Sequence, residues 1–300
     1  MNIGVLEKCG RAEWISGTFI IPKKDNRVRW ITDFCALNKH LIRKHYQLPR
    51  IADLLAKRNG YKFLTKLDIS MHYYTFALDE ASRALCTIST PFGLYRYLRL
   101  PMGILVASDI AQELTERVLQ DIEDLSSYMD DIAAFSDNWP NHLHLLRTIL
   151  RRLEENNFSI NPRKCEWVVQ ETEDFLGHWL TPHGIKPWRK KVDAILAIQP
   201  PTTLKQLRAF IGMVTYYRDM WLRRSHILSP LTDLLKRHAK HSKLEWPPAC
   251  DAAFKRMKAL IASDALLAYP DHNQPFDIET DASNLQLGAV IKQNGRPVAY

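Results

Sequence analysis

The chain has 300 residues, 46% of them hydrophobic, and can therefore bury a substantial core in two or three subdomains. It contains no apolar run near the roughly 18 residues that a membrane span needs, and it begins without the apolar segment of a signal peptide, so we expect neither a membrane protein nor a secreted one. Its net charge of +8 combines +9 in residues 1–66, −9 in residues 67–185, +9 in residues 186–240 and −1 in residues 241–300.

An acidic middle between two basic segments suits a protein that holds metal ions and grips phosphates, although solvated helix faces without a partner would give the same totals. The order favours nucleic acid, whose backbone supplies most of the affinity through counterion release. The five cysteines stand far apart with no Cys-x-x-Cys pair. This spacing predicts reduced thiols in an intracellular protein and argues against a structural zinc site. Within the cell, we expect the protein in a cytoplasmic particle or the nucleus.

In chain order, residues 16–34 predict a two-stranded hairpin from which the cations Lys23 and Arg29 project. A helical pattern then stops at Asn59-Gly60, before a strand that carries Asp68.

Residues 85–100 predict two further strands, followed by a bend at residues 101–103 and a helix over residues 108–122 with Ser108 as its cap. The run 127–135 places two adjacent carboxylates between strand-forming residues. This pattern predicts a hairpin that carries the acids at its tip.

In a straight strand Asp130 and Asp131 would point to opposite faces, and one of them would be buried. A turn or a bound cation resolves the conflict, because an unpaired buried carboxylate is very costly. Together with Asp68, the pair would form an oxygen cage for magnesium, a hard cation. Three carboxylates facing two metal ions is the arrangement that polymerases use for in-line phosphoryl displacement. An ordinary polar turn is the alternative.

Downstream, spaced leucines predict an amphipathic helix through residues 143–153, and the runs 158–162 and 165–169 predict edge strands. From Lys186 the chain turns helical and basic, with one apolar stripe over residues 204–217 that we assign to the core. Residues 238–248 predict a linker, and strand-like runs follow it.

Tyr128-Met129-Asp130-Asp131, with Leu67-Asp68-Ile69 upstream, resembles the catalytic core of a reverse transcriptase. Further segments resemble parts of gypsy-type LTR retrotransposon reverse transcriptases in the same order. Residues 32–39 resemble the fingers motif, residues 100–103 the loop before the palm helix, and residues 175–180 the hairpin that positions the primer. Residues 212–218 resemble the thumb, and residues 276–283 the start of a ribonuclease H domain.

The resemblance implies an α+β right-hand polymerase fold. Residues 1–185 would form the fingers and a palm with an antiparallel sheet, and residues 186–240 a helical thumb or connection. Residues 241–300 would form a linker and a truncated, ribonuclease H-like segment.

The resemblance also implies residue roles. Asp68, Asp130 and Asp131 would be the catalytic ligands of two Mg²⁺ ions, with Mn²⁺ as a substitute. The ring of Tyr73 would lie under the sugar and clash with a 2′-OH, with plain core packing as the alternative. The other implied site residues fall into three groups. The nucleotide would be contacted by Lys23, Arg29, Met102 and Gly103, and the primer end by Gly177, His178 and Trp179. In the ribonuclease H-like segment, Asp281 would be the first metal ligand.

Four positions depart from the family pattern: Cys35 replaces the usual Arg, Met71 a Gly, Ser108 a Pro and Ala111 a Phe. A buried Phe lost to Ala costs about 3–5 kcal/mol if nothing refills the space. Met71, Ser108, Ala111 and the abrupt C-terminus favour the alternative of a degenerate retroelement copy that binds nucleic acid without polymerising, whereas the intact acids speak against it. A non-catalytic interaction scaffold is the third hypothesis.

The resemblance implies an RNA-directed DNA polymerase that transfers deoxynucleotides from their triphosphates to a primer 3′-OH on an RNA or DNA template. It also implies that the chain is part of a larger polyprotein. Ribonuclease H chemistry uses several carboxylates, and those after Asp281 would lie beyond Tyr300. We therefore expect no RNA-strand cleavage by this chain.

Overall fold

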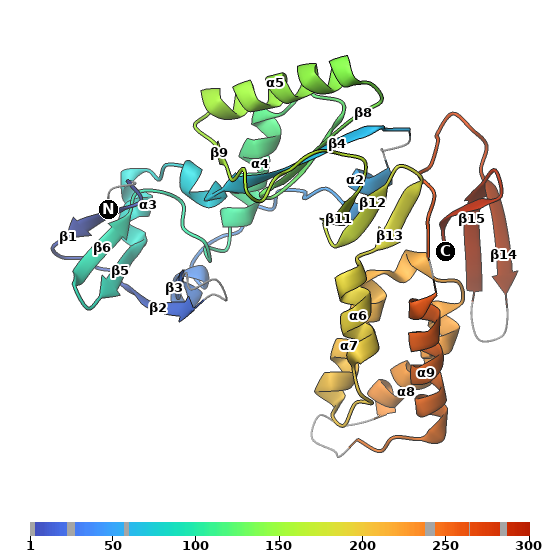
Figure 1. The fold of residues 1–300 in the computed structure, drawn as a ribbon. Coiled ribbons are helices and arrows are strands. Elements are labelled where there is room, and N and C mark those ends of the chain that lie inside the picture. The colour runs from blue at the N-terminus through green and yellow to red at the C-terminus, as the bar shows by residue number, and fades with distance from the viewer. Residues whose placement is uncertain (1–3, 23–27, 57–59, 238–243, 264, 283–286) are drawn as a thin grey trace. The chain divides into compact units, whose positions relative to one another are not determined.

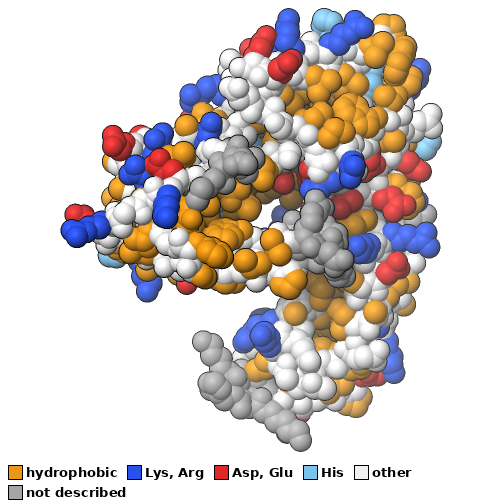
Figure 2. Space-filling model, turned by 60° about the vertical axis from the view of Figure 1, so that its left-hand side comes forward, with side chains coloured by type: hydrophobic (Ala, Val, Ile, Leu, Met, Phe, Trp, Pro, Cys, Tyr) orange, Lys and Arg blue, Asp and Glu red, His pale blue; other side chains and the backbone are white. Residues whose placement is uncertain are grey.

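The computed structural model describes the chain except for residues 1–3, 23–27, 57–59, 238–243, 264 and 283–286 (Figure 1). The chain divides into two compact units: the first unit comprises residues 1–50 and 65–167, and the second unit residues 51–64 and 168–300. No helix among the described residues is both long and apolar enough to cross a membrane. On the face drawn in Figure 2, basic and acidic side chains are interspersed with exposed apolar ones.

The first unit contains a five-stranded sheet in the order β1-β6-β5-β2-β3. Its pairs are antiparallel except for β2 and β5, which run parallel. The pairing of β2 with β3 confirms the predicted hairpin of residues 16–34. The strands are Leu6–Cys9 (β1), Ser16–Pro22 (β2), Val28–Thr32 (β3), Thr87–Thr90 (β5) and Gly93–Tyr97 (β6).

The second sheet has the order β10-β4-β8-β7, with the short β9 paired antiparallel to β4. It confirms the strand predicted around Asp68 and the hairpin predicted over residues 127–135. Its strands are Phe63–Ser70 (β4), Leu125–Tyr128 (β7), Asp131–Ser136 (β8), Ser159–Ile160 (β9) and Glu166–Val169 (β10).

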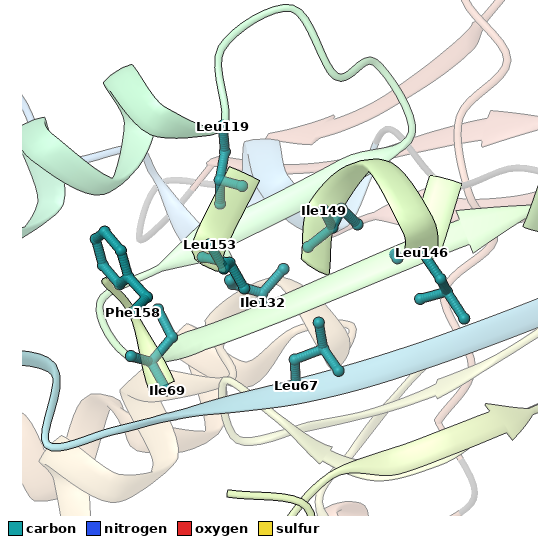
Figure 3. Close-up of a cluster of buried hydrophobic side chains, with 9 residues drawn as sticks. Leu67, Ile69, Leu119, Ile132, Leu146, Ile149, Leu153 and Phe158 are labelled. Carbon is teal, nitrogen blue, oxygen red and sulfur yellow. The ribbon is translucent and has the colours of Figure 1, made fainter. Parts of the chain in front are cut away.

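Helix α5 (Trp139–Glu155) packs on one face of the second sheet, and Figure 3 shows its apolar side chains above those of β4 and β8. Asn138 caps its start, because the side chain accepts a hydrogen bond from the amide of Asn141 at 2.9 Å. Burying each Leu or Ile of this core contributes about 1.5–3 kcal/mol. The predicted amphipathic helix is confirmed, and its buried positions are His142, Leu146, Ile149 and Leu153.

Helix α4 (Ala107–Val118) starts and ends earlier than the predicted residues 108–122. Its N-cap residue is Val106, and no side chain caps it. The prediction that Ser108 caps this helix is therefore wrong, because Ser108 already lies inside the first turn. The other helices of the first unit are Cys35–Asn38 (α1), the 3-10 helix His72–Thr75 (η1) and Glu80–Leu85 (α3).

The second unit combines a three-stranded sheet, β11-β12-β13, with a group of helices and a second three-stranded sheet, β14-β15-β16. Leu204, Leu207, Phe210 and Val214 are buried on one face of α7, which confirms the predicted stripe. The elements are Ile51–Ala56 (α2), Thr172–Phe175 (β11), His178–Thr181 (β12), Gly184–Pro187 (β13), Arg189–Ala197 (α6), Leu204–Tyr216 (α7), Arg218–Met220 (η2), Arg224–Arg237 (α8), Pro248–Ala262 (α9), Asp277–Ala282 (β14), Leu287–Gln293 (β15) and Arg296–Ala299 (β16).

Candidate active site

Strand β4 carries Asp68 on the face that points away from α5. Leu67 and Ile69 are buried in the core beneath α5. Because successive side chains of a strand alternate between its faces, Asp68 points to the opposite side of the sheet. Its side chain is 14% exposed, so the carboxylate is sheltered but can still be reached from solvent.

Met129 and Asp130 form the two-residue loop between β7 and β8. Tyr128 and Asp131 pair across the two strands, and Met129 has a φ of 54°. Two-residue hairpin loops require a positive φ of this kind. The loop resolves the conflict between adjacent acids, since Asp130 is exposed in the turn while Asp131 begins β8.

The three acids lie at neighbouring ends of adjacent strands. The amide of Ile69 donates a hydrogen bond to the carbonyl oxygen of Asp130 at 2.8 Å, which ties the turn to the end of β4. Ile132 is buried in the same core as Ile69, and β4 and β8 are neighbours in the sheet. Strand alternation therefore puts Asp131 on the same sheet face as Asp68.

Lys164 forms an ion pair with both oxygens of the Asp68 carboxylate, at 3.0 and 3.2 Å from its Nζ. Asn161, just after β9, holds this segment in place because its amide donates to the carbonyl oxygen of Asp68 at 2.9 Å. In this arrangement the described residues contain no preassembled cluster of three metal-ligating His, Cys, Asp or Glu side chains. The carboxylates are nevertheless the hard oxygen donors that Mg²⁺ prefers, and the ammonium shows that Asp68 attracts a cation.

Gln112, from α4, fixes the acidic turn. Its side chain is fully buried. The Oε1 atom accepts from the amide of Met129 at 2.6 Å, while Nε2 donates to the carbonyl oxygen of Ser127 at 3.2 Å and to Glu116 Oε1 at 2.7 Å. A buried amide that satisfies both its donor and its acceptor in this way allows little movement of the turn.

His72 is buried beside the same helix. The hydroxyl of Thr115 donates to the carbonyl oxygen of Ala111 at 2.8 Å, so it must accept a hydrogen bond from His72 Nε2 at 2.7 Å. Nδ1 then carries a lone pair and has no partner. Burial lowers the pKa of His72 to about 4, although the charge of Asp130 opposes this shift. The imidazole is therefore neutral near pH 7.

Tyr73 is oriented by Ser108, since the two hydroxyl oxygens lie 3.1 Å apart. The ring is only partly buried. Met71, which precedes η1, has a φ of 53° and a ψ of 36°, in the left-handed region. A side chain there is strained, and this explains why glycine suits the position.

Asn38 holds the loop that contains Met102 and Gly103. Its Nδ2 donates to the carbonyl oxygen of Gly103 at 2.9 Å, and its Oδ1 accepts from the amide of Leu105 at 2.8 Å. Gly103 has a φ of 99°, which requires a glycine. The side chain of Met102 is 46% exposed.

In the hairpin of β2 and β3, Arg29 is exposed and pairs across the strands with Ile21. Lys23, the second cation predicted to contact the triphosphate, lies outside the described residues.

In the second unit, Leu176 and Gly177 form the turn between β11 and β12 with φ values of 51° and 71°. The hydroxyl of Tyr216 donates to the carbonyl oxygen of Leu176 at 2.6 Å, and that of Tyr217 to the carbonyl oxygen of Gly177 at 2.5 Å. A Cβ atom on Gly177 would lie 2.8 Å from Lys191 Nζ and 2.9 Å from the Tyr216 hydroxyl. The positive φ of Gly177 favours glycine at this position, and a Cβ atom there would displace the ends of the Lys191 and Tyr216 side chains.

His178 is buried against the rings of Tyr216 and Tyr217, whose centroids lie 5.7 and 5.3 Å from its own. Burial lowers the pKa of His178. Trp179 pairs with Lys186 across β12 and β13. Asp281, in β14, is 75% exposed and lies 3.5 Å from the guanidinium of Arg223.

A family model described as reverse transcriptase (RNA-dependent DNA polymerase) matches residues 21–180, which is more than half of the chain. The chain belongs to the reverse transcriptase family. A second model, for an RNase H-like domain found in reverse transcriptase, matches residues 246–300 of this reverse transcriptase chain.

The curated relatives are transposon polyproteins, several of them described as retrovirus-related Pol polyproteins. Those from transposons 297 and gypsy of Drosophila melanogaster are 34 and 33% identical over 100 and 96% of this chain. The Tf2-7 polyprotein of Schizosaccharomyces pombe is 30% identical over 91%. The chain spans 29, 29 and 20% of the lengths of these three relatives.

Solved structures confirm the predicted polymerase fold. The chain matches a foamy viral protease-reverse transcriptase in complex with double-stranded DNA at a TM-score of 0.92, with 22% identity, over 100% of this chain and 53% of that one. A foamy viral protease-reverse transcriptase in complex with an RNA/DNA hybrid matches at a TM-score of 0.86, with 23% identity, over 99% of this chain and 40% of that one.

Several residues around the acids of this reverse transcriptase chain were not predicted from its sequence. The sequence contained one indication of the role of Gln112, because a long polar side chain in the middle of a predicted helix can bind the backbone of a neighbouring turn. Lys164 had none, since its contact with Asp68 joins residues 96 positions apart. The bidentate pair of Arg43 with the buried Asp109, at 2.7 and 2.9 Å, was missed for the same reason.

Proposed function

We propose that this chain catalyses RNA-directed DNA synthesis and adds deoxynucleotides to a primer 3′-OH opposite an RNA or DNA template. The observation that carries the proposal is the position of Asp68 beside the Asp130-Asp131 turn, in a chain of the reverse transcriptase family. In the reaction the primer 3′ oxygen forms a bond to the α-phosphorus, pyrophosphate leaves, and the hydroxyl proton passes to solvent.

Asp68, Asp130 and Asp131 would hold two Mg²⁺ ions, or Mn²⁺ in their place. Such ions, when bound, make the 3′-OH more acidic and stabilise charge on the leaving pyrophosphate. Gln112 would keep the acidic turn in one position. Lys164 would have to leave Asp68 for that carboxylate to serve as a metal ligand.

The remaining contacts follow the predicted roles. Lys23 and Arg29 would neutralise charge on the triphosphate. Tyr73, oriented by Ser108, would present its ring to the sugar and disfavour a 2′-OH. The loop of Met102 and Gly103 would approach the nucleotide, and the turn of residues 177–179 would hold the primer 3′ end.

The division of labour would follow the predicted segments. Residues 1–185 would act as fingers and palm, and residues 186–240 as the thumb. Asp281 would occupy the first metal-ligand position of the ribonuclease H-like segment, residues 241–300. A labelled RNA–DNA hybrid tests whether this chain cleaves an RNA strand.

Primer extension on poly(rA)/oligo(dT) tests the polymerase proposal. The wild type should extend the primer with Mg²⁺ or Mn²⁺, and Asp130→Asn should abolish extension. Asp124→Asn, which removes an exposed carboxylate from the loop before β7, is the matched control and should extend normally. A wild type that binds template–primer without extending it would refute the proposal in favour of the degenerate copy. The absence of both activities would favour the scaffold.

A further inference from the structure

Residues 41–50 have no regular secondary structure, and side-chain contacts attach this segment to helix α4. Arg43 donates to both carboxylate oxygens of Asp109, which is buried in the first turn of α4, at 2.7 and 2.9 Å. About two turns further along the helix, the hydroxyl of Tyr46 donates to Oε2 of Glu116. Asp109 and Glu116 thus lie on the face of α4 that meets this segment.

Glu116 accepts hydrogen bonds from two side chains. Its Oε2 accepts from Tyr46, and its Oε1 accepts from Nε2 of Gln112 at 2.7 Å. Both donors are neutral, and the neighbouring cation, Arg117, pairs with Glu113 at 3.0 Å instead. Hydrogen bonds to an ionised carboxylate are roughly twice as strong as those between neutral groups. The carboxylate of Glu116 therefore joins Tyr46 firmly to Gln112.

The donors and acceptors follow a fixed order. The hydrogen bond to Glu116 raises the pKa of Tyr46 to about 12, so the phenol keeps its proton and donates at neutral pH. An ionised carboxylate only accepts, and Gln112 must therefore turn its NH2 group toward Glu116. This orientation leaves Oε1 of Gln112 to accept from the amide of Met129 at 2.6 Å. Hydrogen bonds thus run without interruption from Tyr46 to the acidic turn.

The contact with Glu116 is the shorter of the two that hold the NH2 group of Gln112. Nε2 lies 2.7 Å from Oε1 of Glu116 and 3.2 Å from the carbonyl oxygen of Ser127. Because Gln112 is fully buried, loss of the stronger contact would leave a buried donor poorly satisfied and its side chain free to shift. The amide of Met129 would then lose its fixed partner.

We propose that Tyr46 and Glu116 are positioning residues for nucleotide addition: they hold Gln112, and Gln112 holds the turn that carries Asp130 and Asp131. The link to nucleotide addition rests on the proposed function. Both residues act through Gln112, so their loss should free the turn and slow the chemical step while the binding of template and primer is retained. A pair that only stabilised α4 would change the free energy of unfolding without a specific effect on the turn.

The first test measures hydrogen exchange at the Met129 amide by NMR, without metal, nucleotide or nucleic acid. Glu116→Ala and Tyr46→Phe should both exchange faster at this amide than the wild type. Glu116→Gln keeps an acceptor for Gln112 and should stay protected. Glu113→Ala, which removes an exposed carboxylate from the same helix, is the matched control and should exchange as the wild type does.

Equal exchange at the Met129 amide in Glu116→Ala and Glu113→Ala would overturn the proposal. An equal acceleration at the amides of α5 would overturn it too, because it would show a loosened fold and not a freed turn. If Glu116→Ala fails to fold, Tyr46→Phe, which keeps the ring and removes only the hydroxyl, decides between the same outcomes.

The second test separates the chemical step from binding. Glu116→Ala should lower the maximal rate of single-nucleotide addition by about 10–100-fold, with the Kd of template–primer unchanged. Glu116→Gln should recover most of the rate, and Glu113→Ala should keep all of it. A rate in Glu116→Ala equal to that in Glu113→Ala, or a parallel loss of template–primer affinity, would refute the positioning role. A wild type that adds no nucleotide but shows the exchange pattern expected for Glu116 would refute polymerisation and support the hold on the turn.

Discussion

Removing Lys164 should increase the affinity of the acidic site for a divalent cation, because its ammonium competes for Asp68. The Nζ atom lies 3.0 and 3.2 Å from the two carboxylate oxygens. The lysine side chain is 59% exposed, so solvent screens the pair. Exposed ion pairs contribute about 0.2–1 kcal/mol. Losing the competitor should therefore strengthen binding by up to about fivefold.

The assay is a titration with Mn²⁺ followed by the electron paramagnetic resonance signal of the free ion, which falls as the ion binds. Lys164→Met should bind Mn²⁺ more tightly than the wild type. Lys292→Met, which breaks a pair with Glu279 at 2.7 Å, is the matched control and should bind as the wild type does. Adding Asp68→Asn to Lys164→Met should cancel the gain. An unchanged or weaker affinity in Lys164→Met would refute competition and would make Lys164 a supporting group.

Two further predictions concern the backbone and the buried histidine next to the acids. Left-handed backbone costs a residue with a side chain about 1–2 kcal/mol, and glycine loses about 0.4–1 kcal/mol through the unfolded state. Met71→Gly should therefore be more stable than Met71→Ala by about 0.5–1 kcal/mol in urea unfolding. Ala194→Gly, at an exposed position of helix α6, is the control and should lower the free energy of unfolding by about 1 kcal/mol. If Met71→Ala were the more stable of the two Met71 variants, the backbone at position 71 would not be strained. The lowered pKa of His72, about 4 in the folded chain, means that stability is complete above the unfolded value of about 6.5 and declines as the pH falls towards 4. At pH 5, protonation of this histidine in the unfolded chain should lower the free energy of unfolding by about 2 kcal/mol. In His72→Gln, the difference in unfolding free energy between pH 7 and pH 5 should be smaller by this amount. An unchanged difference would show that His72 accepts a proton in the fold.

Local sequence patterns were sufficient to predict the strands and the hairpin that carry the acids. The alternation of Leu67, Asp68 and Ile69 indicates which face of this strand is buried, and two adjacent acids between strand-forming residues predict a turn. The conformation of Met71 and the start of α4 were not predictable in the same way. A left-handed φ at methionine follows from the path of the chain into η1, and α4 begins at Ala107, directly after Val106, whose backbone already has helical dihedral angles.

The side chains that support the acidic turn, directly or through His72, are uncharged and distant in the sequence, and they were therefore not predicted. Gln112 binds the amide of Met129, and Thr115, one helical turn later on α4, fixes His72. His72 stays neutral near pH 7 because of its burial. The support of the turn thus adds no cation that would compete for the carboxylates. Lys164 is different, because it approaches from an exposed segment after β9 and can withdraw into solvent. The uncharged, buried side chains of Gln112, Thr115 and His72 would hold the acids in place while the ammonium of Lys164 leaves Asp68 and a metal ion takes its position.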